Sequence, residues 1–313
     1  MTAMTSHEHN HNHGHHQADA AAISPARFRF VTLLNLLITI AEFIGGIVSG
    51  SLALLSDAVH NLSDTASILI SYYAFRIAGR KRDSSHTFGY QRAEILAAFI
   101  NAVTLAVICV FLVIEAIKRF YNPSPVKGQV MLIVAAIGLI SNLVSVLLLH
   151  SGAKASLNVR SSYLHLLGDT ISSVGVILGG IAIIVWKVYW IDPLITLLVA
   201  LYIAKESAGI IRRSVHIMMQ GAPETSLPEL QKDLLALPGV QNVHHAHIWM
   251  LNDRSIHFEA HIDVDDNLLS DLAPLVDEIN RRLAANHGID HVTIQFECGR
   301  CQNKDLLYQK DPE

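Results

Sequence analysis

Charged residues are scarce in this sequence. They make up 16% of the 313 residues, whereas a typical soluble domain has about 25%. The deficit is concentrated in residues 28–212, and the remainder of the chain is ordinarily polar. This contrast predicts one region that lies in lipid and another that lies in water.

Cysteine is also nearly absent. Cys109 lies in an apolar run, and Cys298 and Cys301 form one CxxC pair near the C-terminus. Three cysteines in this pattern exclude a disulfide framework. The N-terminus lacks a basic start followed by a short apolar core, so we expect no cleavable signal peptide. The net charge of −4 gives no indication that nucleic acid is a partner.

The sequence divides into three parts. Residues 1–26 have low complexity and predict a disordered tail that collects metal ions weakly. Its histidines are His7, His9, His11, His13, His15 and His16. Residues 27–212 predict a transmembrane domain, and residues 213–313 predict a cytosolic domain that binds metal and dimerises.

Six apolar runs fill the transmembrane region. They cover residues 28–50, 52–79, 91–119, 128–151, 161–186 and 190–211. Each run is long enough to cross a hydrocarbon core, which takes about 20 helical residues. The fold class is therefore predicted to be an α-helical bundle of six transmembrane helices, followed by an α+β domain.

Basic residues predict the orientation in the membrane. Eleven lie at or beside the first run's start, the connections after the second and fourth runs, and the sixth run's end. The connections on the opposite side hold four. Because cytoplasmic segments carry the excess of Lys and Arg, we expect both termini in the cytoplasm of a multi-pass inner-membrane protein.

The C-terminal region predicts the element order αββαβ, which is typical of ferredoxin-like and metallochaperone-like domains. Helices are expected at about 226–237 and 268–287, and strands at about 240–251, 254–264 and 290–297. In the second strand, apolar residues from Ile256 to Val264 alternate with polar residues from His257 to Asp263. One face should therefore pack on the helices and the other should stay open.

Two of the apolar runs contain the same pair of metal-binding residue types. The second run has His60 and Asp64, and the fifth has His165 and Asp169. A spacing of four places both side chains of a pair on one helix face. Two such helices facing each other offer two imidazole nitrogens and two carboxylate oxygens, a tetrahedral set that suits Zn²⁺.

The alternative is that these four residues only cap or pack helices near the membrane interface. Ionisable groups inside a bilayer are costly and mark a transport pathway by default. The repeated spacing makes chance placement an unsatisfactory explanation. We therefore interpret the four residues as a transport site.

These motifs resemble those of the cation diffusion facilitator family, close to its bacterial zinc-exporting branch. The resemblance covers nearly all of the chain after the tail. It is carried by Ser51-Leu-Ala-Leu-Leu-Ser-Asp-Ala-Val-His-Asn-Leu-Ser-Asp64, His86-Thr-Phe-Gly-Tyr-Gln-Arg-Ala-Glu94, His165-Leu-Leu-Gly-Asp169 and the αββαβ domain. It implies a transport site at His60, Asp64, His165 and Asp169, a homodimer, and exchange of metal for protons. The His at the first of these positions is associated with zinc.

Two further groups of residues are weaker candidates for metal binding. Asp83 and His86 follow the second run, but Tyr90 stands where some family members have a His ligand. In the cytosolic domain, strand alternation predicts that His247, His261 and Glu297 converge on the open face of the sheet. The resemblance implies a regulatory metal at the same three positions. Cys298 and Cys301 are candidates for an additional ligand.

The sequence thus predicts a proton-coupled exporter of Zn²⁺, with Zn²⁺ also as a regulatory ligand. An intramembrane metalloprotease would need a motif such as HExxH, which does not occur. A membrane-anchored metal sensor would not need ligands inside the bilayer. An exporter of Co²⁺, Fe²⁺, Ni²⁺ or Cd²⁺ stays open, because sites of nitrogen and oxygen ligands do not select sharply among metals.

Overall fold

The computed structural model describes residues 25–153, 157–301 and 304–307. Two compact units are distinguished, and each is described by itself. One contains residues 1–66 and 107–203, and the other contains residues 67–106 and 204–313. The predicted tail histidines, from His7 to His16, lie outside the described residues.

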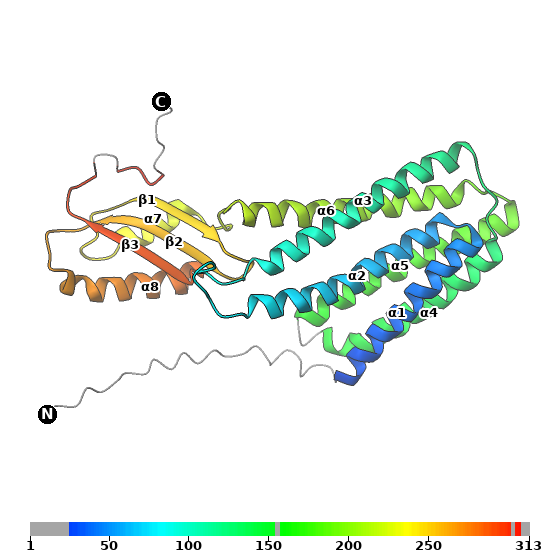
Figure 1. The fold of residues 1–313 in the computed structure, drawn as a ribbon, viewed down its shortest axis with the longest axis horizontal. Helices are drawn as coiled ribbons and strands as arrows, with labels where there is room; N and C mark the ends of the chain where they lie inside the picture. Colours follow the sequence, from blue (N-terminus) through cyan, green and yellow to red (C-terminus); the bar gives the residue numbers. More distant parts are fainter. Residues whose placement is uncertain (1–24, 154–156, 302–303, 308–313) are drawn as a thin grey trace. The chain divides into compact units, whose positions relative to one another are not determined.

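Six long helices account for the six apolar runs (Figure 1). They are α1 (Pro25–Ser49), α2 (Leu52–Ala78), α3 (Ala93–Tyr121), α4 (Gly128–Ala153), α5 (Leu157–Trp186) and α6 (Ile191–Met218). The helical class predicted from the sequence is confirmed. The sixth helix ends at Met218, beyond its predicted end at 211.

Among the described residues, four of these helices are long and apolar enough to cross a membrane. They are α3, α4, α5 and α6. The apolar segment Leu33–Ser49 of α1 is shorter. Helix α2 carries Asp57, His60 and Asp64 within its span, which lowers its hydropathy. Other polar residues of this helix, such as Ser56 and Asn61, add to its polarity.

Helix packing in the first unit is centred on α4. It lies along both α5 and α1. The buried cluster joins Ala53 and Leu54 of α2, Met131 and Ala135 of α4, and Val176 and Ile183 of α5. Many other apolar side chains of these helices are exposed, such as Leu147, Ile171 and Leu198. This arrangement suits lipid, because side chains facing hydrocarbon stay apolar.

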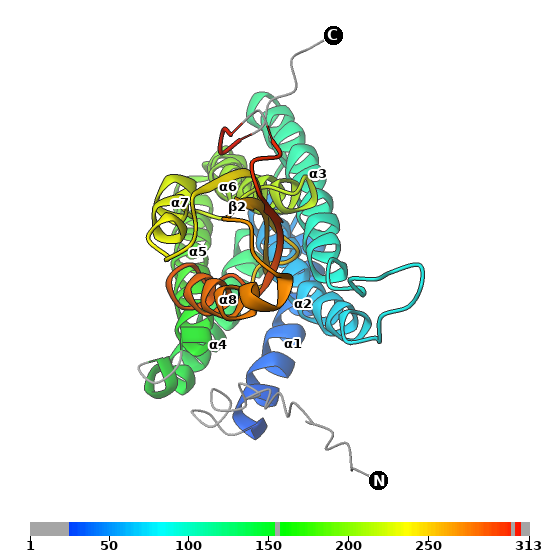
Figure 2. The same ribbon diagram turned by 90° about the vertical axis from the view of Figure 1, so that its left-hand side faces the viewer.

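The αββαβ order of the C-terminal region is confirmed. Its elements are α7 (Leu227–Leu235), β1 (Asn242–Met250), β2 (Ile256–Asp263), α8 (Ala273–His287) and β3 (His291–Glu297), with a short 3₁₀ helix η2 (Leu269–Leu272) before α8. Strands β1 and β2 are antiparallel, and β2 and β3 are parallel. Helices α7 and α8 cover one side of the sheet (Figures 1 and 2).

The apolar face of the sheet is the one that the sequence alternation predicts. Phe258 and Ile262 of β2 are fully buried against Leu230 and Leu234 of α7 and Ile279 and Leu283 of α8. His257, Glu259, His261 and Asp263 occupy the opposite face. Burying these apolar side chains stabilises the domain by about 1.5–3 kcal/mol each.

Candidate metal sites

The first candidate site brings α2 and α5 together through His60. Its Nε2 atom lies 3.5 Å from Oδ2 of Asp64 and 3.7 Å from Oδ1 of Asp169. The Asp169 side chain is 7% exposed and that of His60 is 18% exposed. Two carboxylates from different helices therefore share one half-buried imidazole. His165 lies on α5 one turn before Asp169, and its side chain is outside the described residues.

Two more carboxylates lie beside this site. Asp57, on α2, accepts a hydrogen bond of 3.1 Å from Ser172 of α5. Glu42, on α1, accepts one of 2.9 Å from Asn61, the residue after His60. Both carboxylates are buried. The polar contacts of this region therefore join α1, α2 and α5.

Two other polar residues of the long helices form side-chain contacts outside this site. Glu115 pairs with Arg119 one turn later on α3, at 3.2 Å. Asn101 donates a hydrogen bond of 2.6 Å to Ser67. These two polar groups therefore have structural partners of their own.

The beginning of α2 is held by a residue that the sequence analysis did not single out. Asp192, at the start of α6, accepts hydrogen bonds from the backbone N–H groups of Leu52 (2.8 Å) and Ala53 (3.3 Å) and from the Ser51 hydroxyl. Free N–H groups at a helix N-terminus favour such a carboxylate. Asp192 is fully buried, so it caps α2 from a distant part of the sequence. The sequence signal for this cap is an acidic residue directly before Pro193 in an otherwise apolar run.

The second candidate site lies on the open face of the cytosolic sheet. Ligand atoms of His244, His261, Glu297 and Cys301 all lie within 4.8 Å of one another. Within the described residues, no other group of three or more His, Cys, Asp or Glu is as compact. Nδ1 of His261 is 3.0 Å from Glu297, and Nε2 of His244 is 3.4 Å from the other oxygen of that carboxylate.

The buried histidine of this cluster lacks hydrogen bonds. His244 is fully buried, and neither of its ring nitrogens has a hydrogen-bond partner among the described residues. The same holds for Oε2 of Glu297. A buried polar group without a partner costs about 1–3 kcal/mol. The nearest charged atoms to the His244 ring are carboxylate oxygens, Oε2 of Glu297 at 3.4 Å and Oδ2 of Asp263 at 3.8 Å. A bound cation would satisfy His244 and Glu297, so this group fits a metal ligand set.

The protonation of Cys301 is linked to Glu297. The thiol donates a hydrogen bond to the carboxylate, which lowers the pKa of Glu297 and raises the pKa of Cys301. Cys301 is therefore a protonated thiol near neutral pH when no metal is bound. Because a metal binds the thiolate, occupation of this site would release a proton.

His247, a predicted ligand, lies outside the compact group in the structure. Simple alternation along β1 placed His247 with His261 and Glu297, but His244 occupies that position. A β-bulge lies between His244 and His247, and the register pairs His244 with His261 and His247 with Glu259. The extra residue lets both histidines share the open face, and only His244 lies opposite His261. His247 is exposed and lies outside the compact group.

The C-terminal segment completes the cluster. The backbone N–H groups of His245 and Ala246, in the bulge, donate to the carbonyls of Asp305 and Leu306. Lys304 binds Asp263 through an ion pair of 2.6 Å. This return of the chain brings Cys301 to 3.9 Å from Nδ1 of His261. Cys298 is exposed and is not in the group, so the two cysteines of the CxxC pair have different surroundings.

The third candidate site, in the loop between α2 and α3, is closed by hydrogen bonds. Asp83 accepts from the Tyr90 hydroxyl at 2.8 Å, from Ser85, and from the His86 backbone at 2.8 Å. The Tyr90 hydrogen bond is the largest cause of a lowered pKa for Asp83. The ring of His86 stacks on Tyr90 with centroids 4.3 Å apart. Asp83 is thus already satisfied by its own loop.

A substitution at Tyr90 tests whether this residue stands in the position of a metal ligand. We expect Tyr90→His to add one high-affinity zinc equivalent per chain, since His is a preferred zinc ligand and Asp83 and His86 already lie beside this position. Tyr90→Phe is the matched control, because it removes the hydrogen bond without adding a ligand. Equilibrium dialysis with zinc measures both. Equal stoichiometry in the two variants would contradict the interpretation.

Comparisons with known proteins agree with this architecture. Residues 29–219 match the cation efflux transmembrane domain, and residues 222–298 match the cytoplasmic domain of cation efflux proteins. The zinc transporter ZitB of Pectobacterium atrosepticum is 40% identical over 275 residues, which are 87% of this chain and 85% of the relative. The metal cation efflux system protein CzcD of Cupriavidus metallidurans is 39% identical, with 85% and 84% covered.

A third relative comes from Bacillus subtilis. It is named a cadmium, cobalt and zinc/H⁺-K⁺ antiporter, and it is 40% identical over 262 residues, covering 82% of this chain and 84% of the relative. Both domains are matched in their expected order, and the relatives span most of the chain. The protein is therefore a member of the cation efflux family, the cation diffusion facilitators.

Proposed function

We propose that this protein exports Zn²⁺ from the cytosol in exchange for protons, by alternating access. The observation that carries the proposal is the contact of His60 with two carboxylates, Asp64 of its own helix and Asp169 of α5. We assign the transport site to these three residues together with His165. The names of two relatives, a zinc transporter and a cadmium, cobalt and zinc/H⁺-K⁺ antiporter, support zinc export by antiport.

Proton exchange follows from the chemistry of the ligands. Zn²⁺ needs neutral imidazoles and ionised carboxylates, so protons compete with the metal for the same atoms. The unperturbed pKa of His is about 6.5, close to physiological pH. Protons arriving from the more acidic side would therefore displace Zn²⁺. An all-carboxylate site would respond less near neutral pH.

Other functions have less support. A membrane-anchored sensor would need no ligands between transmembrane helices, whereas His60 and Asp169 contact each other across α2 and α5. The matched family and the relatives are transporters, and we infer that this chain is not an enzyme. Export of cadmium or cobalt beside zinc is a second candidate, since one relative is named for all three.

The proposed organisation follows the predicted boundaries. Residues 1–26 form a metal-collecting tail, residues 27–212 the transmembrane domain and residues 213–313 the cytosolic domain. Both termini face the cytoplasm, and the protein lies in the inner membrane as a homodimer. The excess of basic residues beside the proposed cytoplasmic ends of the helices supports the orientation.

Vesicles containing the purified protein test the transport proposal. Zinc and proton fluxes are followed together with two fluorescent dyes, with an imposed pH gradient. We expect zinc movement in one direction to be accompanied by proton movement in the other. Zinc flux that is independent of the pH gradient would refute the exchange. A sensor without transport activity would show neither flux.

We also propose a regulatory zinc site at His244, His261, Glu297 and Cys301. The buried His244 without hydrogen bonds and the mutual distances of the four ligands support it. Binding there would offset the negative charge of Glu297. The loss of this charge would favour close approach of two cytosolic domains. The candidate at Asp83 and His86 has less support, because Tyr90 and the loop backbone already occupy Asp83.

Zinc should stabilise the cytosolic domain of the full-length protein through this cluster. At 100 times the dissociation constant, one bound ion contributes about 2.7 kcal/mol to the free energy of unfolding. The triple variant His244→Ala, His261→Ala and Glu297→Ala should lose this stabilisation and the zinc-dependent shift toward dimer. It should stay folded, because the apolar core lies on the other face of the sheet.

Thermal unfolding and sedimentation in detergent, with and without zinc, measure the two effects. His291→Ala is the matched control, since this exposed histidine lies on β3 outside the compact group. An identical response of the triple variant and the wild type would place the regulatory site elsewhere.

A further inference from the structure

Four histidines of the cytosolic domain form a row from the surface to the interior. Successive ring centroids are 5.2 Å apart for His247 and His245, 4.6 Å for His245 and His261, and 5.4 Å for His261 and His244. Along this row the residues change from exposed (His247) through half-buried (His245 and His261) to fully buried (His244). The inner two belong to the compact cluster, and the outer two do not.

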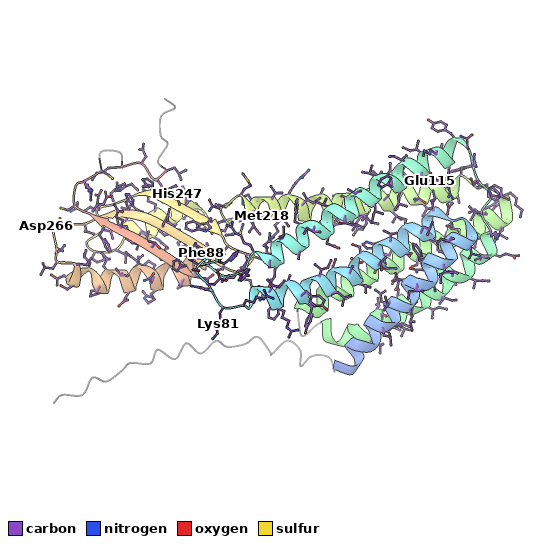
Figure 3. All side chains as sticks on the ribbon, in the orientation of Figure 1. Lys81, Phe88, Glu115, Met218, His247 and Asp266 are labelled. Carbon is purple, nitrogen blue, oxygen red and sulfur yellow. The ribbon has the colours of Figure 1, made fainter. Side chains whose placement is uncertain are left out.

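The outer end of the row opens into a cavity. His247, labelled in Figure 3, lines a cavity of about 540 Å³ together with Glu259, His291, Thr293 and Trp249. Glu259 lies directly opposite His247 on β2. A carboxylate beside an exposed imidazole attracts divalent cations. The mouth of the row is therefore suited to receive a metal ion from solution.

The bulge in β1 places His245 within the row. In a regular strand His245 would lie on the same face as His247 and on the face opposite to His244, so only the bulge allows all three rings to lie in one row. The backbone of His245 has a φ of 50°, a left-handed conformation that is uncommon for residues other than glycine. Strain of this kind costs about 1–3 kcal/mol and often accompanies function. The hydrogen bond from His245 N–H to Asp305 helps to hold it there.

We propose that His247 and His245 form a temporary metal-binding pair through which Zn²⁺ reaches the buried cluster of His244, His261, Glu297 and Cys301. This inference rests on the proposed zinc site at that cluster. The rings of His247 and His245 lie at 69° to each other, with centroids 5.2 Å apart, so an ion bound to one imidazole at about 2.0–2.1 Å lies close to the other. Water completes its coordination at the outer pair.

Transfer in steps avoids the cost of losing all hydration at once. The cluster's inner ligands are buried: His244 is 0% exposed and Glu297 is 5% exposed. Stripping a divalent ion of water before it meets a ligand is expensive. Along the row each imidazole replaces one water before the ion moves inward. At the last step Cys301 releases its proton as its thiolate binds the metal.

The rate of metal arrival at Cys301 tests the proposal. Co²⁺ is the probe, and the absorption band of a thiolate–Co²⁺ bond reports occupation of the cluster, because the transport site contains no sulfur. The full-length protein carries Cys298→Ser in all samples, which removes the exposed cysteine. Stopped-flow mixing then gives the rate and the final amplitude of the band.

We expect His247→Ala to slow the appearance of the band by about tenfold without changing its final amplitude, the lower end of the range for residues that support a metal site. His291→Ala, in the same cavity but outside the row, should leave the rate unchanged. A wild-type rate for His247→Ala would overturn the proposal and favour direct access beside Cys301.

A reduced final amplitude would also overturn it, since His247 would then be a permanent ligand. Failure of the proposed regulatory site gives a different result. In that case, the thiolate–Co²⁺ band is absent from every sample, including the one with the native histidines.

Discussion

Asp169→Ala should abolish zinc transport while the protein still inserts and dimerises. Asp169 is the carboxylate of α5 that contacts His60, and it is 5% exposed. Loss of a residue that only supports a metal ligand costs about 10–100-fold, so loss of a direct ligand should lower zinc flux by more than about 100-fold. Flux into vesicles at equal protein content measures the effect.

Two further variants show whether the charge of Asp169 is what matters. Asp169→Asn keeps nearly the same shape and should be as inactive, because a neutral amide is a weak zinc ligand. Glu115→Gln is the matched control: Glu115 is an intramembrane carboxylate that pairs with Arg119 and should be dispensable for the metal. Transport near the wild-type level in Asp169→Asn would refute the assignment of the site.

His60→Asp should change which metal is carried. The substitution replaces one of two imidazoles by a carboxylate and leaves a harder set of one nitrogen and three oxygens, with His165 as the remaining imidazole. Harder oxygen ligands suit Mn²⁺ better than nitrogen ligands do, and the family resemblance associates Asp here with manganese or cadmium. We expect uptake of Mn²⁺ or Cd²⁺ relative to Zn²⁺ to rise by about tenfold, which corresponds to 1.4 kcal/mol in relative affinity.

Competition between metals in the same vesicles gives this ratio directly. His60→Gln separates the two contributions, because it removes the imidazole without adding a charge. We expect it to lose zinc transport without gaining either of the other metals. A metal ratio in His60→Asp equal to that of the wild type would show that selectivity depends on other residues.

In the cytosolic domain, local sequence patterns predicted the orientation of side chains in one strand but not in another. The alternation in β2 correctly predicted that Phe258 and Ile262 face the helices and that His261 faces outward, since a regular strand has a period of two. The same rule failed in β1. One extra residue between His244 and His247 changes which histidine lies opposite His261, and no local pattern marks where a bulge occurs.

In the transmembrane region, too, the sequence predicted local features but not the contacts between helices. The spacing of His60 and Asp64, and of His165 and Asp169, predicted two polar helix faces, because the α-helical period is a local property. The contact between His60 and Asp169 joins helices more than 100 residues apart in the chain, and it depends on how α2 and α5 pack. The cap that Asp192 places on α2 likewise needs the two helix ends to meet.

By itself, the sequence determined the helical and αββαβ classes, the two His–Asp pairs and the open face of the sheet. These follow from hydrophobic periodicity and from the cost of placing ionisable groups in a bilayer. Only the tertiary structure decided that His244 takes the place predicted for His247, that Cys301 and not Cys298 joins the cluster, and that Tyr90 satisfies Asp83. The first depends on a β-bulge, the second on the C-terminal segment that returns to the sheet, and the third on the conformation of a loop. Contacts between residues distant in sequence, or a choice among several possible turn conformations, set these geometries.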